Sequence, residues 1–195
     1  MYASPPDHTQ TSGRSARPAP QCIVLAGPPC SGKSTLARIL AEKHHLRWIQ
    51  MDEVLSQLIP HSDRNESDRL IGYRGMLILA RELGRCSRSV VLDATFTSSS
   101  CRTLLRNWIG TVAIPTRIIQ VRVPAAIAVE RFRERRGHSA TDLDEPRVKQ
   151  LAENYPYMSD RLIVDGGRPL GQALCAIEEY VGLNPSALDG RTTGH

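Results

Sequence analysis

Short apolar runs alternate with amphipathic stretches along most of the sequence. The run Cys22–Ala26 (CIVLA) is apolar throughout, which is typical of a strand buried on both faces of a parallel sheet. Five strands are predicted, at Cys22–Ala26, Arg47–Met51, Ser89–Asp93, Thr116–Val123 and Arg161–Val164. Because helical patterns separate them, we expect an α/β fold with a mainly parallel sheet.

Helical spacing is clearest after the first strand, where Leu36, Ile39 and Leu40 share one face. A short helix is expected to begin at Glu53, after the second strand. The other predicted helices are Lys33–His44, Asn65–Gly84, Ser100–Trp108, Pro124 to about Arg136, Glu145–Asn154 and Pro169–Val181.

The two ends of the chain lack this periodicity. Residues 1–20 are rich in Pro, Ser, Thr and Ala, and residues 184–195 are similar, so both are predicted to be disordered tails around one domain at 21–183. No apolar run is long enough for a membrane span, and the first residues lack the apolar core of a secretory signal. Five cysteines without a CxxC pair favour reduced thiols and a cytoplasmic location.

The formal net charge is +5, and all but three of the 25 basic residues are arginines. Codon usage in a GC-rich genome explains this bias, and so does a surface that handles phosphates, which a guanidinium binds through two hydrogen bonds. Nucleic acid is permitted as a partner but not favoured, because the charge is modest and aromatic residues make up only 5% of the chain.

A phosphate-binding motif follows the first strand. Residues 27–35 (GPPCSGKST) match G-x-x-x-x-G-K-[ST] between an apolar strand and an amphipathic helix. The loop amides and the helix N-terminus are expected to bind ATP phosphates, with Lys33 at the β- and γ-phosphates and Ser34 on Mg²⁺. The predicted nucleotide-binding residues are Gly27, Pro28, Pro29, Cys30, Ser31, Gly32, Lys33, Ser34 and Thr35.

Carboxylates stand at or just after the ends of three other strands. Asp93 closes the third strand, where an acid in phosphate-loop proteins holds Mg²⁺. Asp52 follows the second strand and Asp165 the fifth. Since the carboxyl ends of parallel strands share one rim, the three acids and the loop predict a metal–phosphate site.

Asp52 has two interpretations. It fits the N-cap of the helix expected to begin at Glu53. It also fits a general base that takes the proton from an acceptor hydroxyl, which favours a kinase over a plain ATPase. Glu53 is a weaker candidate for the base.

Arginines suited to phosphate contacts occur in two places. Arg131 and Arg135 are one helical turn apart and precede a polar stretch, residues 137–145, that can act as a lid. They are candidates to neutralise charge on the γ-phosphate in the transition state, although a solvated helical face is the alternative. Arg102, early in the helix after the third strand, is a candidate to bind the acceptor.

These motifs together resemble the P-loop kinases of the family that includes predicted AAA-type kinases, the polynucleotide kinase domain, chloramphenicol phosphotransferase and the zeta toxins. The resemblance spans Cys22 to Val181. It implies a fold like that of nucleoside monophosphate kinases, a five-stranded sheet of order 2-3-1-4-5 with a lid, and transfer of the ATP γ-phosphate to a hydroxyl. By this resemblance Asp52 is the base, and Arg131 and Arg135 are lid arginines. The loop after the fifth strand, Asp165 to Arg168, borders the adenine.

The resemblance does not name the acceptor. A regulatory ATPase and a 5′-hydroxyl polynucleotide kinase remain alternatives to a kinase of a small molecule or nucleotide-like acceptor. In this fold the acceptor pocket is built from the variable segment Leu55–Gly75, whose residues point to no particular compound.

Overall fold

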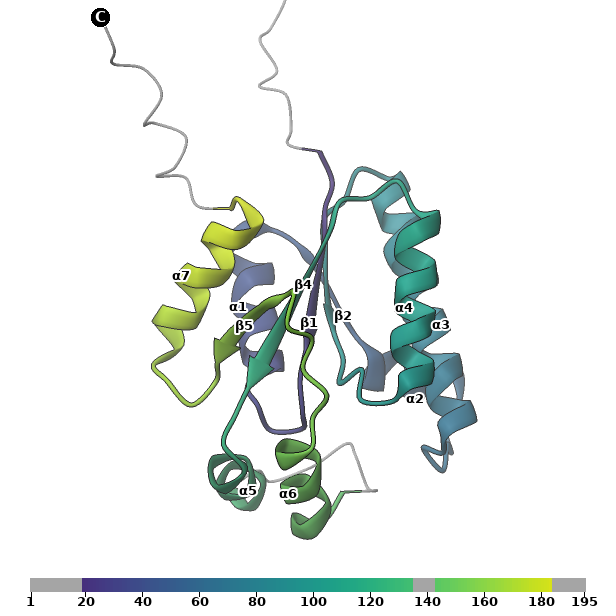
Figure 1. Ribbon diagram of the computed structural model, residues 1–195. Coiled ribbons are helices and arrows are strands. Elements are labelled where there is room, and N and C mark those ends of the chain that lie inside the picture. The colour runs from purple at the N-terminus through teal and green to yellow at the C-terminus, as the bar shows by residue number, and fades with distance from the viewer. Residues whose placement is uncertain (1–18, 135–142, 184–195) are drawn as a thin grey trace, which may run out of the picture.

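The computed structural model describes residues 19–134 and 143–183. Its centre is a sheet of five parallel strands in the order β2-β3-β1-β4-β5, as expected (Figure 1). The strands are β1 (Cys22–Ala26), β2 (Arg47–Gln50), β3 (Val90–Asp93), β4 (Thr116–Arg122) and β5 (Leu162–Asp165). The predicted tails lie outside the described residues, apart from the last two residues of the first tail, and the domain limits remain a prediction.

Helices cover both faces of the sheet (Figure 1). Helices α1 (Lys33–His44) and α7 (Leu170–Val181) pack on one face, and α2 (Met51–Leu58), α3 (Glu66–Arg85) and α4 (Ser99–Thr111) lie on the other. Helices α5 (Ala125–Glu134) and α6 (Glu145–Glu153) lie beyond the carboxyl ends of the strands. This arrangement places α5 and α6 next to the loops that carry the predicted site.

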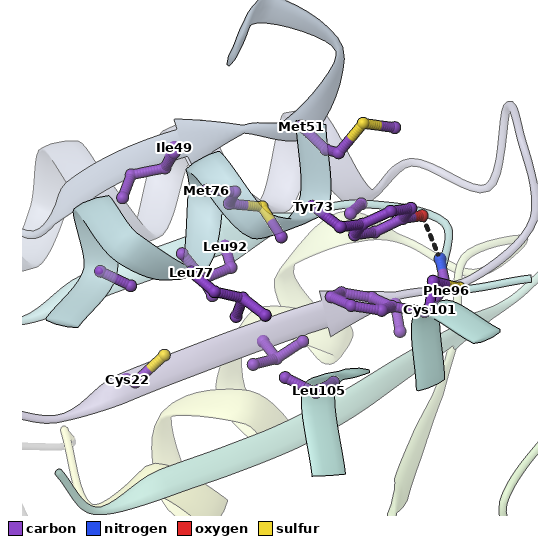
Figure 2. Packing of buried hydrophobic residues seen from close by; sticks show 14 of the residues in the cluster. Cys22, Ile49, Met51, Tyr73, Met76, Leu77, Leu92, Phe96, Cys101 and Leu105 are labelled. Carbon is purple, nitrogen blue, oxygen red and sulfur yellow. Dashed lines mark hydrogen bonds between the residues drawn. The ribbon is translucent and has the colours of Figure 1, made fainter. Parts of the chain in front are cut away.

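Buried side chains form one cluster on each face of the sheet. The larger one contains Met51, Tyr73 and Phe96. Figure 2 shows the hydrogen bond that the backbone nitrogen of Phe96 donates to the Tyr73 hydroxyl. Every residue of β1 is fully buried, as its unbroken apolar run predicts. No helix in the described ranges is long and apolar enough to cross a membrane.

The contact between α2 and α3 is unusually close. A Cβ added to Gly72 would lie 3.0 Å from Leu55 Cβ and 3.1 Å from Met51 Sδ. A side chain there would push the helices apart, so the glycine sets where α2 lies. Since α2 carries Asp52, this contact also positions one wall of the site.

Candidate active site

The phosphate loop is shaped by two glycines with positive φ angles. Gly27 has φ 151°, and an added Cβ would lie 2.5 Å from the carbonyl oxygen of Val121. Gly32 has φ 97° and is the N-cap residue of α1. Both positions therefore require glycine, and the loop leads directly into the positive end of a helix.

Lys33 lies over the loop and is nearly buried, with 7% of the residue exposed. Its amino group donates to the carbonyl oxygen of Pro28 at 2.8 Å and lies 3.4 Å from Ser31 Oγ. The ammonium is thus held at the loop itself, where phosphate oxygens would replace or join these acceptors.

A cavity of about 960 Å³ opens beside the loop. Lys33, Ser34 and Asp93 line it together with Asp52, which comes from the helix after β2. The phosphate loop, the end of β3 and the start of α2 therefore all face this cavity. Asp165 does not face it and lines a second cavity instead. The three acids therefore divide between two cavities, and the assignment of Mg²⁺ to Ser34 and Asp93 remains a prediction. Within the described ranges, no cluster of three His, Cys, Asp or Glu side chains that could hold a metal ion is found.

Asp93 fits a shared magnesium site with Ser34. Only 6% of the residue is exposed, and among the described residues its carboxylate has no hydrogen-bond or ion-pair partner. The Ser34 hydroxyl lines the same cavity, so the two oxygen ligands suit Mg²⁺ bound with nucleotide phosphates.

Asp52 is not an N-cap. Helix α2 begins at Met51 and Gln50 occupies the N-cap position, so Asp52 lies in the first turn. Its carboxylate accepts a hydrogen bond of 2.7 Å from Arg64 Nη1, while 46% of the side chain stays exposed. This charged hydrogen bond holds the Asp52 side chain at the cavity wall.

Sequence reasoning missed a group of side chains at this end of the cavity. Arg64, Arg69, Tyr73 and Arg147 all line it. Arg64 belongs to the turn before α3 and has φ 55°, so no helical periodicity marks it. The only available signal was the expectation that the segment Leu55–Gly75 builds the acceptor pocket.

A hydrogen-bonded network around Thr95 joins this wall to the phosphate loop. The Tyr73 hydroxyl lies 3.1 Å from Thr95 Oγ1, and the Tyr155 hydroxyl donates to the Thr95 carbonyl oxygen at 2.6 Å. The backbone nitrogen of Gly27 donates to the same carbonyl at 3.4 Å. Burial raises the pKa of both tyrosines above their usual range, so both hydroxyls remain protonated donors.

The second cavity, about 430 Å³, lies on the other side of the loop. Arg131 lines it, and its guanidinium donates to the carbonyl oxygen of Gly166 at 2.7 Å and to that of Cys30 at 3.4 Å. Arg168 also lines it and lies 3.4 Å from Asp165. Arg131 thus bridges the phosphate loop and the loop after β5, and its contact with the γ-phosphate stays a prediction.

The described structure does not place Arg102 in either cavity, and it does not include Arg135. Arg102 donates to the carbonyl oxygen of Pro156 at 3.4 Å and is absent from the described lining of both cavities. Arg135 lies outside the described residues, as does most of the polar stretch predicted to act as a lid. Their roles remain predictions.

A family model described as AAA domain (AAA_33) matches residues 22–157, which contain the phosphate loop, Asp52, Asp93 and α5. The chain belongs to this family. A comparison with curated proteins gives no match. The resemblance to P-loop kinases drawn from the motifs is confirmed at the level of the family and its fold.

Solved structures of kinases share the fold of this AAA-domain protein at low sequence identity. A sugar kinase from Janibacter sp. aligns with a TM-score of 0.65 and 17% identity over 86% of this chain and 97% of that one. APS kinase of Mycobacterium tuberculosis, solved with AMPPNP and APS, aligns with a TM-score of 0.67 and 18% identity over 85% of this chain and 99% of that one. A gluconokinase from Sinorhizobium meliloti aligns with a TM-score of 0.60 and 18% identity over 90% of this chain and 99% of that one.

Proposed function

We propose that the protein is an ATP-dependent phosphotransferase that moves the γ-phosphate of ATP to a hydroxyl of a small acceptor. The observation that carries this proposal is a single cavity lined by both the phosphate loop and Asp52, which follows a strand two places away in the sheet. A nucleotide switch needs the phosphate loop, but it transfers no phosphate to an acceptor and so needs no general base across the cavity from the loop. The kinases among the similar structures support the same reading.

Groups from the phosphate loop, from α1 and from the end of β3 are proposed to bind the nucleotide and its metal ion. The loop amides and the N-terminus of α1 bind the phosphates, and Lys33 neutralises charge at the β- and γ-phosphates. Ser34 and Asp93 would hold Mg²⁺, which when bound offsets the charge that develops on the transferred group. Arg168, in the second cavity, fits the adenine side of the nucleotide, and Arg131, which bridges the phosphate loop and the loop after β5, is the candidate for the γ-phosphate.

Asp52 is proposed to act as the general base. It accepts the proton of the acceptor hydroxyl as the oxygen bonds to the γ-phosphorus and the bond to the ADP oxygen breaks. Its hydrogen bond to Arg64 fixes the carboxylate, which lines the cavity.

The first test measures ADP release from ATP and Mg²⁺ with and without added alcohols, sugars and a 5′-hydroxyl oligonucleotide. A kinase of small molecules releases ADP in step with formation of one phosphate ester, and the oligonucleotide has no effect. ADP release accompanied only by inorganic phosphate, whatever is added, would identify a regulatory ATPase instead. Stimulation by the oligonucleotide alone would identify a polynucleotide kinase.

A further inference from the structure

Thr95 follows β3, the strand that pairs with β1 on one side and with β2 on the other. In the parallel register, Asp93 is level with Leu25 of β1 and with Gln50 of β2. Two residues beyond these three positions lie, in the same order, Thr95, the first glycine of the phosphate loop and the proposed base. Thr95 also lines the larger cavity. Under the proposed function, a phosphoryl group that moves from ATP to an acceptor beside the base therefore passes Thr95.

The Thr95 hydroxyl is the end of a short chain of hydrogen bonds that begins at the backbone. The backbone nitrogen of Phe96 donates to the Tyr73 hydroxyl at 2.9 Å (Figure 2), and the Tyr73 oxygen lies 3.1 Å from Thr95 Oγ1. Tyr73 is only 3% exposed, and within the described residues its hydroxyl has no further hydrogen-bond partner.

The single proton of the Tyr73 hydroxyl fixes the direction of this chain. A buried hydroxyl that donates to nothing is costly, so the proton is donated to Thr95 Oγ1, its one acceptor in the described part of the chain. A threonine hydroxyl also has one proton of its own. Because Oγ1 already accepts from Tyr73, the Thr95 proton is left for a group bound in the cavity.

A hydroxyl donor at this place suits an oxygen that only accepts hydrogen bonds. The oxygens of the γ-phosphate are of this kind, and they carry the negative charge of the group that is transferred. The acceptor hydroxyl is a poorer match, since a hydrogen bond donated to its oxygen would draw electron density from the atom that attacks phosphorus. Donors linked in a chain also strengthen one another, so Thr95 is a better donor than an isolated hydroxyl.

We infer that Thr95 is a binding residue for the transferred phosphoryl group: its hydroxyl donates a hydrogen bond to a γ-phosphate oxygen, and Tyr73 is the positioning residue that orients this hydroxyl. The inference rests on the proposed function. The Thr95 backbone is held in place beforehand, because its carbonyl oxygen accepts from the Tyr155 hydroxyl at 2.6 Å and from the Gly27 nitrogen at 3.4 Å. A donor fixed in this way needs no reorganisation as charge develops on the phosphoryl group.

The test compares nucleotides with and without a γ-phosphate on the full chain. Calorimetric titration measures the Kd of AMPPNP and of ADP, each with Mg²⁺, for the wild type, Thr95→Val and Thr95→Ser. Valine keeps the branched shape without the hydroxyl, and serine keeps the hydroxyl. We expect Thr95→Val to weaken AMPPNP about tenfold and ADP less than about twofold, because only AMPPNP loses a hydrogen bond to a charged group. Thr95→Ser should bind both within about threefold of the wild type.

Two further variants support the comparison. Thr97→Val is the matched control, since Thr97 lines the same cavity but makes no hydrogen bond within the described residues, and it should bind both nucleotides as the wild type does. Tyr73→Phe removes the hydrogen bond that orients the Thr95 hydroxyl and leaves Thr95 itself unchanged. It should weaken AMPPNP about threefold and leave ADP unaffected, and it carries the test if Thr95→Val does not fold.

The outcomes separate failure of the inference from failure of the proposed function. If the wild type binds neither AMPPNP nor ADP, the proposed function fails. If it binds both, unchanged AMPPNP affinity in the folded Thr95→Val overturns only the inference. Equal losses of AMPPNP and ADP would show that Thr95 merely supports the phosphate loop through its carbonyl group, which also overturns it. The same result follows if Thr97→Val weakens AMPPNP as much as Thr95→Val does.

Discussion

The two cavities beside the phosphate loop are built in different ways. The smaller one and the loop depend mainly on the backbone: glycines with positive φ angles, a helix N-terminus and carbonyl groups bridged by Arg131. The far end of the larger one depends on side chains from α2, α3 and α6. A backbone-built phosphate site can bind the phosphates of any nucleotide, whereas the side-chain wall offers charged groups that can distinguish one ligand from another. Under the proposed function, the first region binds the nucleotide and the second selects the acceptor.

The largest effect is expected at the loop. Lys33→Ala should lower turnover about 10³-fold or more, because it removes the charge facing the β- and γ-phosphates. Lys149→Ala is a matched control, since this exposed lysine pairs only weakly with Glu153, at 3.9 Å. Initial rates and Tm values of both variants check the prediction. Lys33→Ala turnover within about threefold of wild type, under 1 kcal/mol, would remove the loop from the mechanism.

Arg131→Gln tests the bridge on the nucleotide side. Loss of its bonds to the Gly166 and Cys30 carbonyls should weaken ATP binding about tenfold and lower the Tm, as charged hydrogen bonds contribute about 1.5–3 kcal/mol. Arg133→Gln, on the same helix, breaks only an exposed pair with Glu145 and should change little. Calorimetric titration with ATP measures both. Turnover lost with ATP affinity intact would instead favour the predicted role at the γ-phosphate.

Gly72→Val tests whether the close contact between α2 and α3 sets the acceptor side. Added methyl groups would meet Leu55 and Met51, costing about 1–3 kcal/mol and displacing Asp52. Acceptor KM and turnover should suffer more than AMPPNP affinity. Gly110→Val is the control, since nothing lies within 4 Å of the position where its Cβ would stand. Equal losses in AMPPNP affinity and turnover would show that the proposed acceptor side and the nucleotide side of the cavity are not independent.

The smallest effect is expected from Tyr73→Phe. It leaves the buried backbone nitrogen of Phe96 without its acceptor, 2.9 Å away, which should cost about 1–3 kcal/mol of stability. Chemical denaturation measures this cost, and Tyr180→Phe, on an exposed part of α7, should be neutral. A neutral Tyr73→Phe would mean that the Thr95 network does not hold the cavity wall.

Much of the fold follows from periodicity, and the limits of prediction have physical causes. The buried strands and the glycine-rich loop have strong local signals, so the parallel sheet and the phosphate site were expected from the residues, whereas the strand order was expected only from the resemblance to P-loop kinases. The start of α2 was misplaced because Met51 extends the apolar pattern of β2, and short apolar runs do not distinguish strand from helix.

The acceptor wall was not predictable in the same way. Arg64 acquires its role from a left-handed backbone conformation and an ion pair with Asp52, twelve residues earlier. Arg131 lies on the predicted helix, but its partners belong to loops distant in sequence. Contacts of this kind come from tertiary packing, which local sequence patterns do not encode.

The most direct test of the central claim pairs two measurements on Asp52→Asn, with Glu53→Gln as the control for a neighbouring cavity carboxylate. If Asp52 is the base, acceptor phosphorylation falls about 10²–10⁴-fold in Asp52→Asn. AMPPNP affinity should remain near that of the wild type, and Glu53→Gln should keep its turnover. Near-normal phosphorylation by Asp52→Asn, or loss of it in Glu53→Gln alone, would contradict the account.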